Sequence, residues 1–402
     1  MTAVELTEHG PALPVPLDDA AGRALAHSGV VDAAPDADVP GTWRLRAKNL
    51  VGAVAVRFGG GQVITVRIAP KLPIARLLFL AGYGQGRWHT ENVRVDEDEH
   101  LLPAFARLFT RQAERALRQG LLKGYRETED TALVVRGRIR HAEQVRRHHG
   151  RLVPLELAHD EYTTDIAENR LLRTACEALL RLPGIPVDVR GRLLRLRVRL
   201  GEVTLVRHGD RLPAWRPSRL NVRYHDALRL ADLVLRGASI EHRPGEVTVH
   251  GFLFDLAKVF EDFVTLALRD ALAGTDDFGG HCVRQATHHL DERETIRMVP
   301  DLVAYTDGGT PVAVADAKYK AEKPAGFPDA DLYQMLAYCT ALNLSEGHLV
   351  YAKGNAPHGS HRVKHAGITL HQHALDLDQP PAGLLADVRA VARRLVERLT
   401  VT

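Results

Sequence analysis

The sequence predicts an α/β protein of the multidomain α+β kind, and three observations lead to that class. A chain of 402 residues is long enough for two or three domains. Apolar residues make up 45% of it, which is enough to build cores, although aromatic residues contribute only 5%. The local pattern changes twice, from strand-like runs to helical periodicity and then to alternating strands and helices. We expect a short extension (1–41), a small β domain (42–95), a mostly helical middle region (96–240) and a mixed sheet flanked by helices (241–402).

The small β domain is predicted from three alternating runs. Residues 31–41 (VDAAPDADVPG) are rich in Ala, Pro and Asp and are expected to form a loop. The runs TWRLRAKN, VGAVAVRF and QVITVRIAP follow, and Gly59, Gly60 and Gly61 separate the last two. Glycines between two Val-rich alternating runs are typical of a β-hairpin. The domain is therefore expected to be antiparallel.

Helical periodicity marks the middle region and begins at Leu101. The segment FARLFTRQAERALRQGLL carries apolar residues on one helical face and ends near Gly120 and Gly124. Further helices are predicted at ENRLLRTACEALLRLPG, RGRLLRLRVRLGEV and YHDALRLADLVLRGASI. A strand pair is expected between them, at LVVRGRIR and RLVPLEL.

The C-terminal region alternates between the two kinds of pattern. Helices are predicted at LFDLAKVFEDFVTLALRDAL, ADLYQMLAYCTALN and LLADVRAVARRLVERL. Strands are predicted at TIRMVPDLVAY, TPVAVADAKYK and GHLVYAK. This order favours a mixed sheet with helices on its faces.

Composition excludes several classes of protein. The net charge of +3 and the 26% of charged residues argue against a disordered chain or a simple polybasic tail. The three cysteines are widely spaced and favour neither a disulfide framework nor a cysteine zinc site. No signal peptide and no membrane-spanning run is visible, so we expect a cytoplasmic protein without membrane contact.

Lysine is unusually rare and locally concentrated. Of the 53 Lys and Arg residues only nine are lysine, yet Lys318, Lys320 and Lys323 lie close together. A lysine ammonium is a compact charge on a flexible stem, and unlike a guanidinium it changes its pKa readily. The cluster therefore suggests that lysine is retained here for its chemistry.

A candidate site for phosphodiester hydrolysis lies beside this cluster. Asp301 follows Pro300 within one predicted strand, and Asp316 and Lys318 end the next strand after a Gly308-Gly309 turn. Residues two apart on a strand project from the same face, and a hairpin brings Asp301 alongside them. Carboxylate oxygens suit Mg²⁺, and an ammonium beside the metal can orient or help deprotonate a water molecule. The pattern predicts a metal-and-lysine site.

Additional residues are candidates for the same site. The backbone carbonyl of Ala317 can add a metal ligand from the same strand end. Glu261 on the preceding helix offers a third acid, with Asp262 as the alternative. Gln334 and Tyr338 are four residues apart on a helix, so they share one face and are expected to support the site.

The succession of PD, DAK and QxxxY resembles the PD-(D/E)xK nuclease superfamily. The longer strings FDLAKVFEDFV, VPDLVAY, VADAKYK and DLYQMLAYC are similar to McrC, the cleavage subunit of McrBC-type modification-dependent restriction systems. The runs VGAVAV, ITVRIAPKL, GLLKGYRE, VVRGRIR and ENRLLRTA extend the resemblance over most of the chain from about residue 42. It implies a restriction-endonuclease-like C-terminal domain that uses Mg²⁺. By motif, Asp301, Asp316 and Lys318 form the catalytic trio, and Glu261 matches less specifically.

The resemblance also implies a function and a partner. In that family a separate hexameric AAA+ GTPase recognises and translocates modified double-stranded DNA, typically carrying 5-methylcytosine, and the McrC-like subunit stimulates the GTPase and cuts. The present chain has no GxxxxGK[ST] motif, so it is not itself the motor. The alternative is a non-cleaving regulatory subunit that activates an AAA+ NTPase and uses the nuclease-like domain as a scaffold.

Two groups of basic residues are candidates for contact with these partners. Arg192, Arg195 and Arg199 on an arginine-rich helix, together with Lys320, are candidate contacts to the DNA backbone. Arg44, Arg46 and Lys48 in the small β domain are candidate contacts to the motor. In a chain this rich in arginine, an ordinary solvated face is an equal alternative for both the helix and the β domain.

Overall fold

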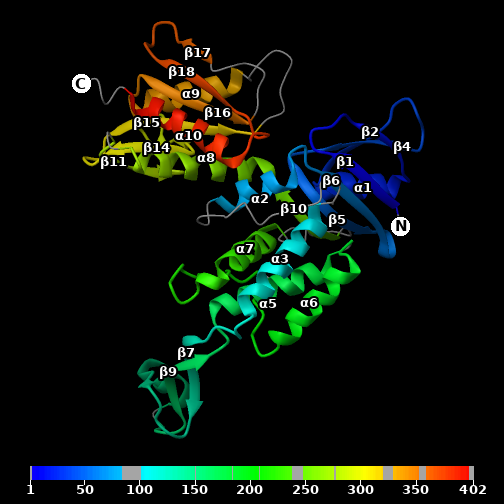
Figure 1. The fold of residues 1–402 in the computed structure, drawn as a ribbon, viewed down its shortest axis with the longest axis vertical. Coiled ribbons are helices and arrows are strands. Elements are labelled where there is room, and N and C mark those ends of the chain that lie inside the picture. The colour runs from blue at the N-terminus through cyan, green and yellow to red at the C-terminus, as the bar shows by residue number, and fades with distance from the viewer. Residues whose placement is uncertain are drawn as a thin grey trace. The chain divides into compact units, whose positions relative to one another are not determined.

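The computed structural model describes residues 2–83, 101–149, 151–182, 184–207, 209–237, 248–275, 278–319, 329–352 and 359–397. The chain divides into two compact units. One combines Met1–Leu101 with Ile240–Thr402, and the other is Leu102–Ser239, which is inserted in sequence between the two parts of the first (Figure 1). Both units contain helices and sheet, so the predicted multidomain α+β class is confirmed.

The N-terminal part of the first unit carries two small sheets. The four-stranded sheet has the order β1-β6-β5-β10, with β1 (Thr2–Thr7), β5 (Leu50–Phe58), β6 (Gln62–Ala69) and β10 (Thr248–Asp255). The three-stranded sheet has the order β2-β4-β3, and two helices accompany the sheets: β2 (Leu13–Pro16), β3 (Val31–Pro35), β4 (Thr42–Ala47), α1 (Asp19–Ser28) and α2 (Ile74–Tyr83). The hairpin predicted around Gly59–Gly61 is confirmed, because β5 and β6 pair antiparallel on either side of it.

Two local predictions in this part were wrong. Residues 31–41 were expected to form a loop, but Val31–Pro35 is a strand that pairs with β4. Val31 is almost fully buried, so its backbone is satisfied by a partner strand rather than by water. Residues 253–255 were expected to begin a helix, but they end β10 against β5. Asp255 then caps the following helix, since its carboxylate accepts hydrogen bonds from the backbone N–H groups of the next turn.

The C-terminal part of the first unit is built on a six-stranded mixed sheet. Its order is β11-β14-β15-β16-β18-β17, with β11 (Gly280–Arg284), β14 (Leu302–Thr306), β15 (Pro311–Lys318), β16 (Glu346–Ala352), β17 (Gly359–Arg362) and β18 (Thr369–Leu375). The central pairs β15–β16 and β16–β18 are parallel, and the other pairs are antiparallel. A short antiparallel pair, β12 (His288–His289) and β13 (Arg297–Met298), lies in the connection between β11 and β14. The predicted β14–β15 hairpin is confirmed, and Gly309 supplies its positive φ of 80°.

Helices cover both faces of this sheet. α8 (Leu256–Ala273) and α10 (Pro381–Val396) pack on one face with Ala313, Ala315 and Ala317 of β15. α9 (Asp329–Leu342) packs on the other face, and a Cβ at Gly347 would lie only 2.5 Å from Cys339 Sγ of that helix. This alternation along β15 directs the residues between the alanines toward α9.

The second unit is a helical bundle with a small β subdomain. The bundle consists of α3 (Leu101–Leu117), α5 (Ala167–Arg181), α6 (Val187–Arg199), the 3-10 turn η3 (Val222–Tyr224) and α7 (His225–Gly237). The subdomain, Gly124–Thr163, has a sheet of order β7-β9-β8 and one helix: β7 (Gly124–Ala132), β8 (Arg138–Ile139), β9 (Leu155–Thr163) and α4 (His141–His148). The strand pair expected here exists as β8–β9, but the main partner of β9 is β7, in a stretch where no strand was predicted.

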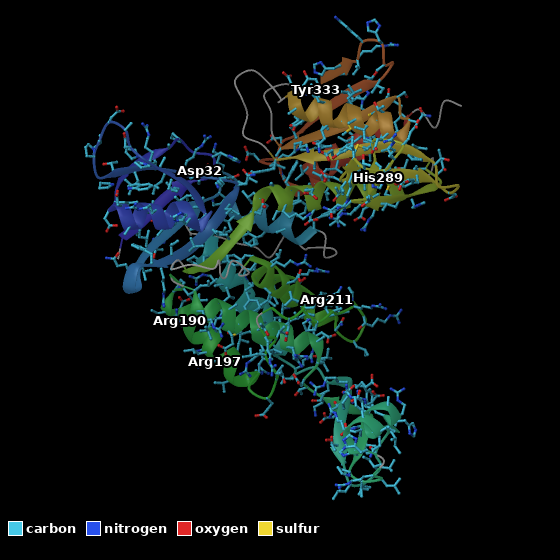
Figure 2. The ribbon with its side chains drawn as sticks, turned by 180° about the vertical axis from the view of Figure 1, so that it is seen from behind. Asp32, Arg190, Arg197, Arg211, His289 and Tyr333 are labelled. Carbon is cyan, nitrogen blue, oxygen red and sulfur yellow. The ribbon has the colours of Figure 1, made fainter. Side chains whose placement is uncertain are left out.

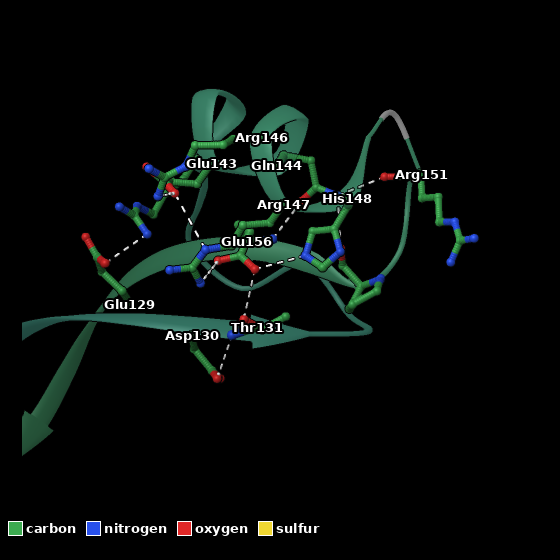
Figure 3. A network of polar contacts seen from close by, with 12 residues as sticks. Glu129, Asp130, Thr131, Glu143, Gln144, Arg146, Arg147, His148, Arg151 and Glu156 are labelled. Atoms are coloured by element: carbon green, nitrogen blue, oxygen red, sulfur yellow. Dashed lines mark hydrogen bonds and ion pairs between the residues drawn. The ribbon is translucent and has the colours of Figure 1, made fainter.

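A buried carboxylate organises the β subdomain (Figure 3). Glu156 on β9 is 3% exposed. Its oxygens accept a hydrogen bond from Thr131 Oγ1 at 3.0 Å and one from Arg147 at 3.2 Å, and they lie 2.9 Å from His148 Nε2. One acidic side chain therefore joins β7, α4 and β9.

Membrane insertion of a helix finds no support in the described part of the chain. None of the helices there is both long and apolar enough to cross a bilayer.

Candidate active site

The β14–β15 hairpin brings the two predicted aspartates together. Asp301 lies immediately before β14, one residue outside the strand in which it was expected. The register pairs Leu302 with Ala315, so Asp301 lies next to Asp316 on the neighbouring strand. Asp301 Oδ2 also accepts a hydrogen bond from the backbone N–H of Ala317 at 2.8 Å. The carboxylate is thereby fixed against the end of β15.

Asp316 and Lys318 share the face of β15 that looks toward α9, as their spacing predicted. Asp316 is only 3% exposed, and its carboxylate forms a close ion pair with the Lys318 ammonium. Asp316 Oδ2 is the buried oxygen that contacts the ammonium, and it has no other hydrogen-bond partner within the described residues. A buried carboxylate oxygen with spare acceptor capacity is what a bound cation requires.

The electrostatics of Asp301 and Asp316 also favour a bound cation. Burial raises the pKa of Asp301 to about 7, and the negative charge of Asp316 adds to that effect. The Ala317 N–H and the Lys318 ammonium lower the pKa of Asp301, but by less than burial and Asp316 raise it. Ionisation of both the half-buried Asp301 and the buried Asp316 would therefore place more negative charge here than one lysine balances.

Lys318 is held in place from α9. Its Nζ donates a hydrogen bond to Gln334 Oε1 at 2.9 Å, and Gln334 Nε2 donates one to the Tyr338 hydroxyl at 2.7 Å. Burial lowers the pKa of Lys318, but the attraction of Asp316 outweighs it, so the net shift is upward. Burial also raises the pKa of Tyr338 to about 12. The predicted supporting pair thus forms a relay from the helix to the lysine.

Of the two candidate third acids, Glu261 lies within electrostatic reach of the aspartates. Its charge contributes to the raised pKa of Asp301. Glu261 Oε1 accepts hydrogen bonds from Lys258 Nζ at 2.9 Å and from Gln285 Nε2 at 2.7 Å. Asp262 instead forms an ion pair with Arg284.

Gln285 was missed by the sequence reasoning. Its backbone N–H donates to the Asp301 carbonyl at 3.1 Å while its side chain contacts Glu261, so it bridges the two acids. The residue follows β11 with a positive φ of 50°. No motif marks this position, because its role depends on a turn that only packing defines.

The acids alone do not form a complete metal cage. Among the described residues, no group of three or more His, Cys, Asp or Glu side chains is placed to hold a metal ion. Two aspartates with a strand-end carbonyl leave room for water and substrate oxygens in an octahedral shell, which is the usual arrangement around Mg²⁺. The donor set therefore fits a hard divalent cation that is only partly held by the protein.

The candidate DNA-binding arginines lie on α6 of the second unit, which also carries Arg190 and Arg197 (Figure 2). Arg192 donates to both oxygens of Glu114, at 3.0 and 2.7 Å, so its charge is already balanced. Arg195 and Arg199 are exposed. Lys320 lies outside the described residues.

The candidate motor-docking residues lie on the exposed side of β4 and just after it. Arg44, Arg46 and Lys48 alternate with the buried residues of that strand. Two of the three have acidic neighbours, since Arg44 lies 3.9 Å from Asp36 and Lys48 lies 3.1 Å from Asp32. The row is therefore less basic than its sequence indicates.

Comparison with known proteins identifies the family. The sequence profile of the family described as "McrBC 5-methylcytosine restriction system component" matches residues 45–352. The chain belongs to this family. The resemblance to McrC stated from the sequence is thereby confirmed, and the chain is a component of the McrBC type.

Solved structures give a likeness in fold to this McrBC component. One is the refined half-complex from a tetradecameric assembly of Thermococcus gammatolerans McrB AAA+ hexamers with bound McrC, with a TM-score of 0.58 and 18% identity over 98% of this chain and 100% of that chain. The cryo-EM structure of the Thermococcus gammatolerans McrBC complex gives a TM-score of 0.38 and 18% identity over 68% of this chain and 89% of that chain. No curated protein sequence matches. The first likeness supports the fold over essentially the full length.

Proposed function

We propose that this McrBC component is the DNA endonuclease subunit of a modification-dependent restriction system and that it requires Mg²⁺. The observation that carries the proposal is the convergence of Asp301, Asp316 and Lys318 at one end of the β14–β15 hairpin. Two carboxylates and an ammonium at one point suit the hydrolysis of a phosphodiester.

The metal would be held by Asp301, Asp316 and the Ala317 carbonyl, with Glu261 close behind. The buried Asp316 oxygen and the raised pKa of Asp301 both indicate a position that favours added positive charge. When bound there, Mg²⁺ would supply charge to offset the phosphate and would make a water molecule more acidic. Glu261 is occupied by Lys258 and Gln285, so it would act mainly by its charge.

The protein's own residues have distinct tasks in this mechanism. Lys318 donates to the attacking water or to a phosphate oxygen and offsets developing negative charge. Gln334 and Tyr338 keep the ammonium at its position, since they form a continuous hydrogen-bonded relay behind it. Burial of Asp316 excludes bulk water from one side of the site, which strengthens each of these interactions.

The family supports a partner as well as an activity. The matching family is named for 5-methylcytosine restriction, and the similar solved structure contains McrB AAA+ hexamers with bound McrC. We infer that this chain binds and stimulates an AAA+ GTPase of that kind and receives modified double-stranded DNA from it. The chain has no phosphate-binding GxxxxGK[ST] motif of its own.

The decisive experiment is cleavage of methylated and unmethylated plasmid DNA, with and without the AAA+ partner and with and without Mg²⁺. Wild type with partner and Mg²⁺ is expected to cut the methylated plasmid. Lys318→Ala is expected to lose at least about a hundredfold in rate, since it removes an ammonium from a buried site. Lys364→Ala, which removes an exposed lysine on the loop after β17, is the matched control and is expected to cut normally.

The same assay separates cleavage from regulation. Asp316→Asn keeps the shape of the side chain, so we expect lost cleavage with unchanged stimulation of the partner's GTPase. If wild type leaves DNA intact under all conditions while GTPase stimulation persists in every variant, the chain is a regulatory subunit and the nuclease proposal is wrong.

A further inference from the structure

A second polar site lies in the Leu102–Ser239 unit, away in sequence from the nuclease motif. It is a pocket of about 730 Å³, formed by the end of α3, the segment before η3, η3 itself and the first turn of α7. This volume is in the range of pockets that bind small molecules. Three arginines line it: Arg115, Arg219 and Arg223.

The pocket carries an excess of positive charge. Arg115 and Arg219 are exposed, and neither side chain has a hydrogen bond or ion pair with the described residues. Asp226 is the one acid in the lining, and Arg229 pairs with it at 3.2 Å. The charge of the three lining arginines is therefore not balanced from within the pocket.

Arg223 is held rigidly. Its guanidinium donates to Gln119 Oε1 and to the Gly120 carbonyl, both at 3.1 Å, and lies 5.4 Å from the centre of the Tyr224 ring. A guanidinium that is already ordered loses little further entropy when it binds an anion. The pocket thus combines one fixed cation with two that are free to close on a ligand.

A glutamine amide adds a neutral hydrogen-bonding group to the pocket. Gln112 lines the pocket from α3 and is 9% exposed, and its side chain makes no hydrogen bond to the described residues. The amide of Gln112 is therefore available for a hydrogen bond to a ligand in the pocket. Gln112 beside three arginines offers a neutral donor together with charged ones, which suits an anion with several acceptor oxygens.

We propose that this pocket binds a phosphate group, carried by a DNA backbone or by a free nucleotide. Guanidinium groups match phosphate oxygens in geometry and charge, and three of them exceed what a single carboxylate requires. Leu220 and Val222 line the same pocket and are 83% and 60% exposed, so they offer apolar contact to a sugar or base next to the phosphate. The proposal does not rest on the nuclease function, because binding is measured directly.

The test uses the full-length protein in EDTA, so that DNA stays intact whatever the nuclease site does. Arg115→Ala/Arg219→Ala removes the two unpaired cations. Arg207→Ala/Arg211→Ala removes two exposed arginines of the same unit that do not line the pocket, and Arg211 is marked in Figure 2. Binding of a fluorescein-labelled DNA duplex, GTP and inorganic phosphate is measured for wild type and both variants at several salt concentrations.

For at least one of these ligands, we expect about tenfold weaker binding by the pocket variant and less than twofold change in the control. If the pocket variant binds only the duplex more weakly, and its binding depends less on salt, the phosphate belongs to DNA. If the pocket variant binds only GTP more weakly, the phosphate belongs to a nucleotide. If wild type binds none of the three, or both variants bind alike, the proposal is wrong.

A third variant distinguishes a specific pocket from diffuse charge. Gln112→Leu keeps the net charge and is expected to fold, since leucine is a good helix former. It should weaken binding of the same ligand about threefold while leaving the thermal midpoint near that of wild type. Unchanged affinity in a folded Gln112→Leu protein would contradict a role for the Gln112 amide and with it the proposed pocket.

Discussion

At the scale of single residues, the candidate active site depends on how Lys318 is constrained. A free lysine samples many rotamers, and ordering one costs entropy. Here Asp316 holds the ammonium from its own strand and Gln334 holds it from α9. The lysine is therefore placed by two elements at once, which explains why a QxxxY helix accompanies the strand motif.

The relay gives a graded prediction. Gln334→Leu removes the direct acceptor for the Lys318 ammonium, so we expect the cleavage rate to fall about ten- to a hundredfold. Tyr338→Phe removes only the second hydrogen bond, and we expect a fall of about threefold to tenfold. Single-turnover cleavage assays with saturating partner and Mg²⁺ measure the rates of both variants.

Tyr333→Phe is the control for this series. Tyr333 lies on the same helix but is 70% exposed (Figure 2). We expect the Tyr333→Phe protein to cleave DNA at the wild-type rate. A Gln334→Leu protein that cuts as fast as Tyr333→Phe would remove the relay from the mechanism, although Lys318 itself could still act.

At the scale of elements, the β7–β9–β8 subdomain shows how a small sheet is stabilised without a large core. Several of its apolar side chains are exposed, including Leu133, Val134 and Leu152. The buried Glu156 instead joins α4 to both long strands by charged hydrogen bonds. Such networks tolerate the loss of one member poorly, because the remaining groups are left buried and unsatisfied.

Because of this network, we expect the stability of the β subdomain to depend on pH. The hydrogen bond to His148, with Thr131 and Arg147 assisting, holds the pKa of Glu156 below its ordinary value. A carboxyl group with a lowered folded-state pKa stabilises the fold above its unfolded-state pKa, and this contribution is lost as the pH falls through the folded-state value. We expect proteolysis within residues 124–163 to accelerate as the pH is lowered below about 4.5.

The Glu156→Gln variant should already show faster proteolysis within residues 124–163 at pH 7. Glu129→Gln is the control, since Glu129 is on the same sheet but is largely exposed in its ion pair with Arg140. Equal cleavage of the two variants at pH 7 would show that the buried network does not determine the stability of the subdomain.

At the scale of the whole first unit, the N-terminal strand reaches the catalytic motif. Glu8 follows β1 and is 0% exposed. Its carboxylate accepts a hydrogen bond from the Lys71 N–H at 3.3 Å, and the nearby Tyr319 hydroxyl lowers its pKa. Tyr319 directly follows Lys318. A residue from the start of the chain is thus linked to the end of β15.

This contact predicts a loss of stability. Burial raises the pKa of Glu8, and the Tyr319 hydroxyl partly opposes that shift. Tyr319→Phe removes a donor from a buried acid, so we expect the free energy of unfolding to fall by about 1–3 kcal/mol. Denaturant unfolding measures the change, and the exposed Tyr333→Phe should leave it unaltered. Equal unfolding midpoints for the two variants would mean that Glu8 is satisfied without Tyr319.

Much of the site was predictable from the sequence because it depends on short-range geometry. Residues two apart on a strand share a face, and residues four apart on a helix do as well. Asp316 with Lys318 and Gln334 with Tyr338 follow from these rules, and the glycine turn places Asp301 beside them. The helices of the middle region were likewise visible as apolar periodicity.

What required the tertiary structure are the contacts between distant segments. The sequence left Glu261 and Asp262 as alternatives, gave no reason to select Gln285 or Glu8, and placed residues 253–255 in a helix rather than in a strand beside β5. It also gave no reason to group Arg115, Arg219 and Arg223. Spacing along one element determines where its side chains point, but which groups they meet depends on the packing of elements that are far apart in the chain.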